Sequence, residues 1–306
     1  MKYLIQHTTA YRYSEPASLG HSEARLTPRT FARQRCLSSR ITVQPQTAAW
    51  AEWDDYFGNR VSYFTVEQEH AELTIAARSE VEVAEPQYPA ANRTPPWEQV
   101  RTELASPRRF EAIAAAQFLF DSPHVRQEPW VAEYAAPSFP PGRPLLEAVL
   151  DLTARIHREF RYTPASTTVS TPIREVFEQR RGVCQDFAHL EIACLRSLGL
   201  AARYVSGYLL TDPPPGSPKL IGADASHAWL SVYCPAAGWL DVDPTNNQLP
   251  ALRHVTLAWG REYRDVCPVK GVVLGGGQHL MRVAVDVVPT ETYPVYCLGA
   301  DPAGRL

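Results

Sequence analysis

The stretch of sequence that decides the fold is GVCQDFAHL, residues 182–190. It predicts a helix that begins at Cys184 and stops at Gly199, because glycine commonly follows the last turn of a helix. Apolar side chains on one stripe of this helix anchor it in a core. These side chains are Phe187, Leu190, Cys194 and Leu198. The first turn, which carries the cysteine, is therefore expected to face outward.

A cysteine at the start of a helix differs chemically from a buried one. The unpaired N–H groups and the positive end of the helix dipole favour a thiolate and can hold the oxyanion of a tetrahedral intermediate. Gly182 allows close approach of the chain, and Arg180 and Arg181 add positive charge. The alternative for Cys184 is a small buried apolar side chain. We expect that state for the other cysteines: Cys36, Cys194, Cys234, Cys267 and Cys297.

Two runs downstream predict a β-hairpin that supplies partners for this cysteine. The runs are SHAWLSVY, residues 226–233, and GWLDVDPT, residues 238–245. A pairing centred on Pro235 sets His227 opposite Asp243, with Cβ atoms about 5 Å apart. At that distance an aspartate accepts a hydrogen bond from one ring nitrogen, which leaves the other nitrogen free to act on a thiol.

Asp241 points to the same face of the predicted hairpin and is the alternative carboxylate. Asp243 is preferred because Pro244 ends the strand directly after it and so places it at the rim. A surface hairpin with a satisfied histidine is the plainer interpretation. A histidine, an aspartate across the hairpin and an upstream helix-start cysteine together favour a catalytic triad of Cys184, His227 and Asp243.

The rest of the chain predicts an α+β protein in three parts. Residues 1–85 contain short runs that alternate apolar with polar residues, which is typical of an antiparallel β domain. Residues 86–143 are rich in proline and predict a connector with one or two short helices that packs on the surface. Residues 144–306 place helices first, from Leu145–Phe160 onward, and strands afterwards, ending with Met281–Val288, and are interpreted as the catalytic core.

Composition narrows the range of partners. The chain has 306 residues and a formal net charge of −3, so it has no general attraction to nucleic acid. Basic residues cluster within Arg25–Arg40, but they favour a solvated face over a track for phosphates. Met1–His7 contains no apolar segment of secretory length, and no run reaches the ~18 residues of a membrane span. We therefore expect a cytoplasmic protein with free thiols, no membrane contact and no cofactor.

A zinc site is a competing hypothesis, with ligands among His227, Cys234, His254 and Cys267. No spacing in the sequence matches a zinc pattern, because paired ligands within a short loop are missing. We therefore expect no metal. A further alternative is a binding or scaffold module that retains a degenerate core.

At these residues the sequence resembles the transglutaminase-like superfamily, in its bacterial branch with a β-rich N-terminal domain. Three blocks, in the family's order of Cys, His and Asp, carry the resemblance. They are Gly182–Ala188, Ser226–Trp229 and Gly238–Thr245. Further similarity extends it over most of the chain, at Tyr3–Tyr13, Arg25–Arg29, Arg264–Pro268 and Gly275–Gly277.

The resemblance implies a papain-like α+β core with Cys184 as nucleophile, His227 as general base and acid, and Asp243 as the residue that orients the histidine. It also implies chemistry on an amide or peptide bond through a thioester acyl-enzyme, which is released to water or to an amine. Relatives include cross-linking transglutaminases, proteases, deamidases and amide hydrolases. A peptide or an amide is therefore the expected substrate.

Gln185 follows the cysteine where the animal cross-linking enzymes carry tryptophan, and no acidic loop of the sequence resembles a calcium site. Hydrolysis by a cysteine protease or amidase is therefore favoured. A protein-glutamine transglutaminase, a deamidase and a non-catalytic binding module remain as alternatives. Four further residues are candidates either for the cleft or for structural roles: Asp186, His189, Tyr208 and Asp224.

Overall fold

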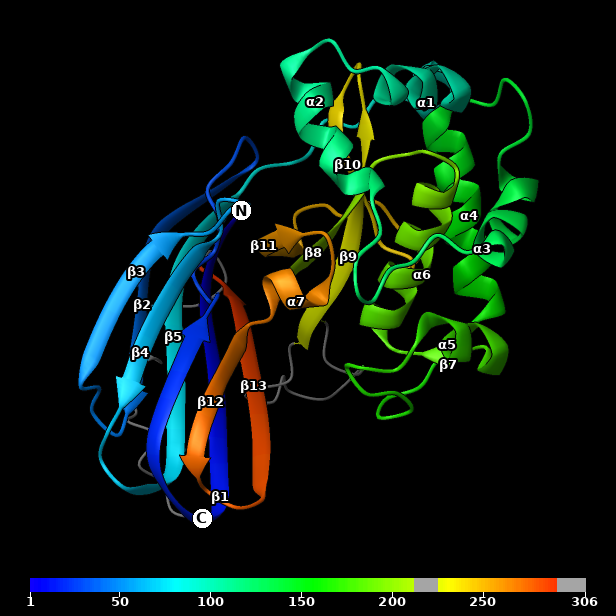
Figure 1. Ribbon diagram of the computed structural model, residues 1–306. Helices are drawn as coiled ribbons and strands as arrows, with labels where there is room; N and C mark the ends of the chain where they lie inside the picture. Colours follow the sequence, from blue (N-terminus) through cyan, green and yellow to red (C-terminus); the bar gives the residue numbers. More distant parts are fainter. Residues whose placement is uncertain (212–224, 291–306) are drawn as a thin grey trace, which may run out of the picture.

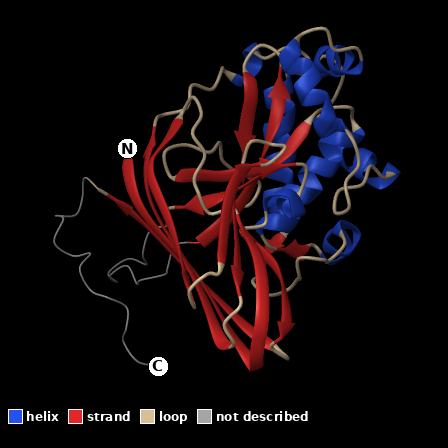
Figure 2. Ribbon diagram, turned by 60° about the vertical axis from the view of Figure 1, so that its left-hand side comes forward, coloured by secondary structure: helices blue, strands red, loops and turns tan. Residues whose placement is uncertain are grey.

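The structure, a computed structural model, describes residues 1–211 and 225–290. Its strands form two main antiparallel sheets that lie side by side (Figure 1). Most of the helices gather on the far side of the second sheet, away from the first (Figures 1 and 2). The expected α+β class is confirmed.

The N-terminal sheet is built around one very long strand, β1 (Lys2–Ala24). Its other members are β2 (Gln34–Gln44), β3 (Ala49–Asp54), β4 (Arg60–Val66), β5 (His70–Val83), β12 (Val269–Gly275) and β13 (His279–Pro289). The first half of β1 pairs with β5 on one side and β13 on the other. Its second half pairs with β4 and β12. One strand thus holds together segments from both ends of the chain.

The two C-terminal strands differ from the expectation. The sequence places Met281–Val288 in the catalytic core, whereas β12 and β13 pair with β1 in the N-terminal sheet. Alternation along a strand predicts that a strand forms and which face is buried, but it does not name the partner strand. The last part of residues 144–306 therefore completes the first sheet instead of the second.

The second sheet carries the strands of the predicted hairpin. Its order is β10 (Gly238–Val242), β9 (Ala225–Cys234), β8 (Ala202–Leu209) and β11 (His254–Gly260), all antiparallel. The central helix α6 (Cys184–Ser197) packs against β9 and β8. It begins at Cys184 as the sequence predicts.

Helix α6 is buried on more than the single stripe expected from its apolar residues. Helices α3 (Pro129–Ala135), α4 (Leu145–Glu159) and α5 (Ile173–Gln179) surround it on the sides that the sheet leaves open. Even Glu191 of α6 is fully buried, and it accepts a hydrogen bond of 2.7 Å from the Thr153 hydroxyl of α4. The middle of the helix, from Asp186 to Arg196, is therefore buried throughout, and the first turn with Cys184 is partly exposed.

The proline-rich segment, residues 86–143, was expected to pack on the surface, but several of its side chains are part of the hydrophobic core. It forms α1 (Trp97–Ala105), α2 (Phe110–Ala116) and α3, with short 3₁₀ turns at Ala91–Arg93, Gln117–Leu119 and Ala136–Ser138. Buried side chains from these helices, among them Trp97, Val100 and Val131, join the main core cluster. Prolines at the helix starts interrupt the chain without preventing this packing.

The basic stretch Arg25–Arg40 is not the solvated face that the sequence suggested. Arg25 is 7% exposed and pairs with Asp55 at 3.1 Å. Arg33 forms an ion pair with Asp241 of the second sheet. These side chains turn inward because the first sheet packs against the second, and a sequence of polar residues alone does not reveal such a contact. Of this stretch, Arg35 and Arg40 are exposed.

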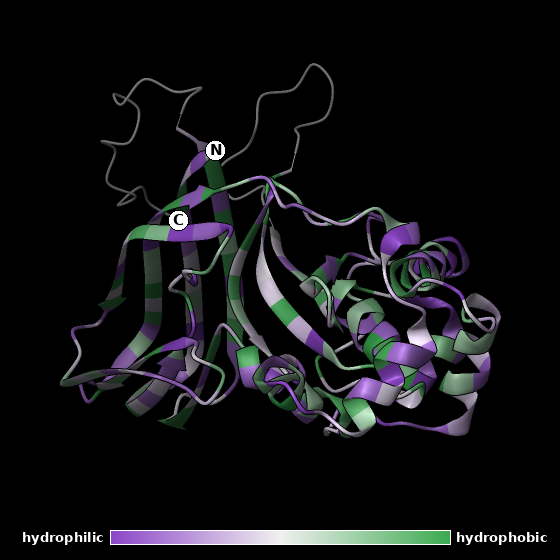
Figure 3. Ribbon diagram, turned by 90° about the horizontal axis from the view of Figure 1, so that it is seen from above, coloured by the Kyte–Doolittle hydropathy of each residue, from purple (hydrophilic) through white to green (hydrophobic). Residues whose placement is uncertain are grey.

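A continuous core joins the two sheets. Buried residues at one end of the N-terminal sheet, including Tyr3, Val81 and Val285, belong to the same cluster as the residues around α6. Figure 3 shows the two halves side by side, with hydrophilic and hydrophobic residues alternating along the strands. Within the described residues, no helix is long and apolar enough to cross a membrane.

The placement of β13 leads to a test of stability. Val285 is 1% exposed in the shared core, while Val283 on the same strand is 47% exposed. We expect Val285→Ala to lower the free energy of unfolding by about 2 kcal/mol, because two buried methyl groups and their packing are lost. Val283→Ala is the matched control and should change it by less than about 0.5 kcal/mol. Urea denaturation measures both, and equal effects would contradict the placement.

Candidate active site

Cys184 is the first residue of α6, and the chain enters the helix in extended form through Val183. The N–H groups of Asp186 and Phe187 bond to the carbonyl oxygen of Val183 at 3.0 and 3.2 Å. Those of Cys184 and Gln185 come before this first closed turn, so the helix offers them no acceptor. The thiol is half-buried. It therefore lies where a helix start favours negative charge.

Asp186 fixes the approach to this helix. Its carboxylate accepts hydrogen bonds from the Val183 N–H at 2.8 Å and from the Thr167 hydroxyl at 2.7 Å. A Cβ on Gly182 would lie only 2.8 Å from this carboxylate, so no larger residue fits there. Of the two sequence interpretations of Asp186, a cleft residue or a helix cap, these contacts favour the cap.

His227 lies on β9, and its Nε2 atom is 2.8 Å from Oδ2 of Asp243. The thiol of Cys184 is a second hydrogen-bonding and electrostatic partner of this ring. Since Asp243 occupies Nε2, the nitrogen available to the thiol is Nδ1. The structure thus brings together all three predicted residues, Cys184, His227 and Asp243.

The register of the hairpin differs from the prediction. Gly238 pairs with Cys234 and Val242 with Leu230, so the turn is centred one residue later than Pro235. His227 and Asp243 are therefore not directly opposite. Asp243 comes after the last residue of β10, where the chain turns, and its side chain reaches His227 diagonally. A one-residue change in the turn shifts the pairing by two, which sequence patterns do not resolve.

Asp243 is fully buried and is the most heavily hydrogen-bonded group of the site. Besides His227, it accepts hydrogen bonds from the side chain of Asn246 at 2.7 Å and from Nε2 of His254 at 3.2 Å. The N–H of Thr245 also donates to it, at 3.0 Å. Burial would raise the pKa of Asp243, but the bonds from His227, His254 and Asn246 outweigh burial and hold that pKa below its ordinary value.

These contacts also set the charge of the histidine. Burial by itself lowers the pKa of His227, but hydrogen bonds with Asp243 and Cys184 raise that pKa to about 10. An imidazolium beside a thiol favours the thiolate, since opposite charges stabilise each other. The arrangement can therefore hold a protonated imidazole beside the thiol of Cys184, with Asp243 fixing the orientation of the ring.

Asp241, the alternative carboxylate, has other partners. It accepts hydrogen bonds from Ser231 and from Arg33 of the N-terminal half. The preference for Asp243 as the partner of His227 agrees with this geometry. Both side chains extend from one short segment, but only the one at the strand end reaches the histidine.

The remaining candidates have structural partners. His189 is buried in α6, where its Nε2 accepts from the Tyr263 N–H at 3.2 Å, and burial lowers its pKa to about 3. Tyr208 is buried and donates to Nδ1 of His7 at 3.0 Å. Asp224 and Cys297 lie outside the described residues.

The sequence did not predict that Asn246 and His254 would donate hydrogen bonds to Asp243. Asn246 follows Asp243 in a turn and also lies 3.3 Å from Nε2 of His227. The run Asp-Pro-Thr-Asn-Asn carries a turn signal that could have pointed to it. His254 opens β11, two strands away from β9 in the sheet, and no local pattern links it to Asp243.

The zinc hypothesis can be compared with the same geometry. His227, His254 and Asp243 each offer one ligand atom, and these atoms lie within 4.8 Å of one another. Tetrahedral zinc with bonds of about 2.1 Å separates its ligand atoms by about 3.4 Å, whereas His227 and Asp243 are 2.8 Å apart. That distance is typical of a direct hydrogen bond. Cys234, at the far end of β9, is not part of this group.

Comparison with known proteins places this site in a family. The model of a bacterial transglutaminase-like N-terminal region matches residues 3–82, and the model of the transglutaminase-like superfamily matches residues 133–244. A Mycobacterium tuberculosis protein, named only as uncharacterised, is 44% identical over 298 residues, which are 95% of this chain and 93% of that protein. The chain belongs to the transglutaminase-like superfamily. The resemblance stated from the sequence is confirmed.

Two further similar proteins extend the comparison. A Mycobacterium leprae protein, also uncharacterised, is 32% identical over 92% of this chain and 97% of its own length. A protein-glutamine gamma-glutamyltransferase from Pseudomonas aeruginosa is 35% identical over 97 residues, which are 31% of this chain and 14% of that protein.

Among solved structures, a Cytophaga hutchinsonii protein described provisionally as a cysteine protease superposes with a TM-score of 0.74. The match covers 96% of this chain and 93% of that chain at 22% identity. At that identity the likeness shows a shared fold, in which the N-terminal sheet lies beside the transglutaminase-like core.

The raised pKa of His227 can be measured directly. By NMR of ring-labelled histidine, we expect His227 to stay protonated through pH 8 and to titrate near pH 10. Asp243→Asn and Cys184→Ala should each lower this pKa, because each removes a partner that stabilises the imidazolium. The stability that the pair contributes is full below pH 6.5, the ordinary pKa of histidine, and is lost as the pH rises through about 10.

Asp151→Asn, on the surface of α4, serves as the control for this titration and should leave the pKa of His227 unchanged. Titration of His227 near pH 6.5 in the unmodified protein would contradict the proposed pair.

Proposed function

We propose that this protein is a cysteine-dependent hydrolase or acyl-transferase that acts on amide or peptide bonds through a thioester. The observation that carries the proposal is the joint contact of His227 with Asp243 and with the helix-start thiol of Cys184. A helix-start cysteine, an imidazole and an orienting carboxylate are the parts that nucleophilic acyl transfer requires. The superfamily is one whose members are typically enzymes.

In the first half of the proposed reaction, the Cys184 thiolate attacks the carbonyl carbon of the substrate. The carbonyl oxygen becomes an oxyanion beside the first N–H groups of α6, which stabilise it. His227 then donates its proton to the amide nitrogen, the C–N bond breaks, and the amine or ammonia leaves. The acyl group remains bound to Cys184 as a thioester.

In the second half, water or an amine attacks the thioester. His227, now neutral, accepts a proton from the attacking group, the C–S bond breaks, and the thiolate–imidazolium pair is restored. Asp243 keeps the ring oriented through Nε2 during both halves, and Asn246 and His254 hold Asp243 in place. These two residues are thus positioning residues.

Hydrolysis is the favoured outcome of the second half. Gln185 stands after the cysteine where animal cross-linking enzymes carry tryptophan. Transfer to an amine is the second candidate, and it rests on the local similarity to the Pseudomonas aeruginosa protein-glutamine gamma-glutamyltransferase. The expected cytoplasmic location stays a prediction.

Thiol reactivity gives the first test. We expect iodoacetamide to modify Cys184 before the other thiols and more slowly below neutral pH, because the thiolate is the nucleophile. Cys194 and Cys234 are buried, and burial raises the pKa of both thiols. Mass spectrometry of peptides follows each site. His227→Ala should slow labelling of Cys184 at pH 7, while His279→Ala, at an exposed position of the N-terminal sheet, should not. Equal labelling of all thiols would refute the reactive cysteine.

Turnover gives the second test. The purified protein is screened against a library of peptides and amides, and release of ammonia, of a peptide or of a conjugate separates deamidase, protease and transferase. Cys184→Ala should lower kcat by at least about 1000-fold, because the thioester cannot form. Cys36→Ala, a half-buried thiol on β2, is the matched control and should keep full activity. Turnover that survives Cys184→Ala would overturn the proposal, and a metal chelator should have no effect.

A further inference from the structure

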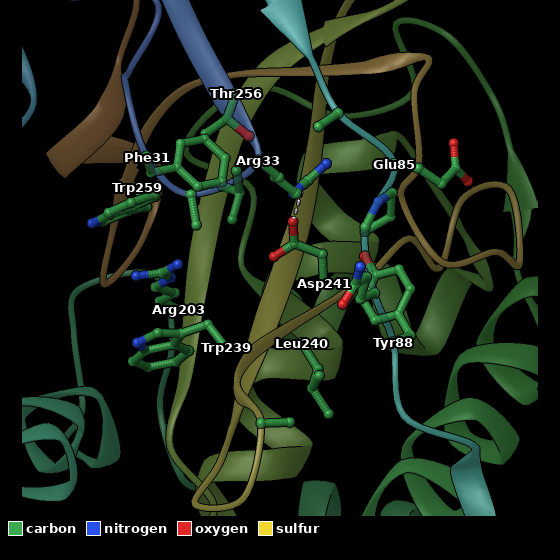
Figure 4. Close-up of a pocket in the computed structure, with 16 residues that line it drawn as sticks. Phe31, Arg33, Glu85, Tyr88, Arg203, Trp239, Leu240, Asp241, Thr256 and Trp259 are labelled. Atoms are coloured by element: carbon green, nitrogen blue, oxygen red, sulfur yellow. Dashed lines mark hydrogen bonds and ion pairs between the residues drawn. The ribbon is translucent and has the colours of Figure 1, made fainter.

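A cavity of about 830 Å³ lies where the N-terminal half meets the second sheet. Its walls include Phe31, Arg33 and Tyr88 from the N-terminal half and connector, and Arg203, Trp239 and Trp259 from the sheet (Figure 4). Among the described residues that line it, none belongs to the group of Cys184, His227 and Asp243. The cavity is therefore a separate feature from the proposed active site.

Arg203 is the central polar group of this cavity. Its side chain lies between two indole rings, with the guanidinium carbon 4.3 Å from the centre of Trp239 and 3.8 Å from that of Trp259 (Figure 4). The residue is only 9% exposed. Its one hydrogen bond within the described chain runs from Nε to the Ser231 hydroxyl at 3.4 Å. No carboxylate of the described residues lies within ion-pair distance of it.

The charges around the cavity leave Arg203 without a counter-ion. Asp241 forms an ion pair with Arg33 and accepts a hydrogen bond from the Ser231 hydroxyl. Nη1 of Arg33 is itself buried without a hydrogen-bond partner among the described residues. A further cation, Arg29, also contacts Trp259, with its guanidinium carbon 3.5 Å from the centre of the ring. The lining residues thus carry two guanidinium groups, of Arg33 and Arg203, and two carboxylates, of Glu85 and Asp241, but no ion pair joins a carboxylate of the described residues to Arg203.

Burying a guanidinium without an anion is unfavourable, since a buried charge is normally paired. The pKa of Arg203 is lowered to about 9, mainly by burial; Asp241 opposes this shift, and the neighbouring Arg29 and Arg33 add to it. Cation–π contact with two tryptophans offsets part of this penalty. The free N–H groups of a planar guanidinium match a carboxylate in bidentate geometry.

We infer that this cavity binds a small organic carboxylate with a flat, aromatic or apolar body. The carboxylate pairs with Arg203 and reaches Nη1 of Arg33, while the body lies against the aromatic wall of Phe31, Tyr88, Trp239 and Trp259. One uncompensated guanidinium matches a monoanion, which favours a carboxylate over a phosphate dianion. The carboxylate belongs either to a free aromatic acid or to the C-terminus of a peptide.

Direct titration tests this site with phenylacetate as the probe and neutral phenylacetamide as its isosteric control. Binding is followed by calorimetry and by tryptophan fluorescence, because Trp239 and Trp259 line the cavity. We expect phenylacetate to bind at least about tenfold more tightly than phenylacetamide, the loss expected when a charge-assisted hydrogen bond is removed. Equal affinities, or stronger binding of inorganic phosphate than of phenylacetate, would overturn the inference.

The peptide Ala-Ala-Phe and its C-terminal amide form the second arm of this titration. Tighter binding of the acid than of phenylacetate assigns the site to a peptide end, and the reverse assigns it to a free aromatic acid. Both results support the carboxylate site, and failure of both acids to bind refutes it.

Three variants connect the binding to these residues. Arg203→Gln should weaken phenylacetate binding by at least about tenfold. Arg35→Gln, whose side chain is 65% exposed on β2, is the matched control and should bind normally. Because Arg203→Gln also removes the contacts of Arg203 with both tryptophans, Ala237→Phe provides an independent variant. Ala237 is exposed and lines the cavity, and its enlargement should block entry. Retained binding in both Arg203→Gln and Ala237→Phe would exclude the site.

The proposed catalysis is separable from this site by the Cys184→Ala variant. Since Cys184 does not line the cavity, Cys184→Ala should bind phenylacetate with unchanged affinity. Loss of binding in that variant would contradict a separate site and would say nothing against the thiol chemistry.

Discussion

The buried carboxylate of Asp243 is the interaction on which the candidate site depends. A fully buried charge is tolerated only when donors surround it, and here His227, His254, Asn246 and the following backbone N–H groups supply them. These donors come from β9, β11 and the turn after β10. Because each must be in place to stabilise the charge, the sheet and the orientation of the histidine are fixed together.

Two parts of the chain pack against the second sheet, which carries His227 and leads to Asp243. Helix α6 fills one side and presents Cys184 at its start, while the N-terminal sheet packs against the remaining surface through a continuous core. The strand β1 connects these parts, since it pairs with the C-terminal strands that follow the transglutaminase-like core. The N-terminal sheet is therefore a structural partner of the core and not an independent appendage.

Two aspartates on one short segment illustrate how position decides role. Asp243 comes after the last residue of β10 and reaches His227, whereas Asp241, inside the strand, is bound by Arg33 and Ser231 at the edge of the cavity. The same strand thus contributes to the thiol site and to the proposed carboxylate site. If binding in the cavity changes the reactivity of the thiol, the effect would have to be transmitted through β10 and its neighbour β9.

The sequence by itself determined the helix start at Cys184, the hairpin strands and the residue types of the triad, because capping, alternation and turn residues act over short distances. It did not determine the register that sets His227 diagonal to Asp243, the contribution of His254, or the return of β13 to β1. It also misjudged Arg33, whose partner Asp241 is 208 residues away. These features depend on which surfaces meet after folding, and only the tertiary structure decides that.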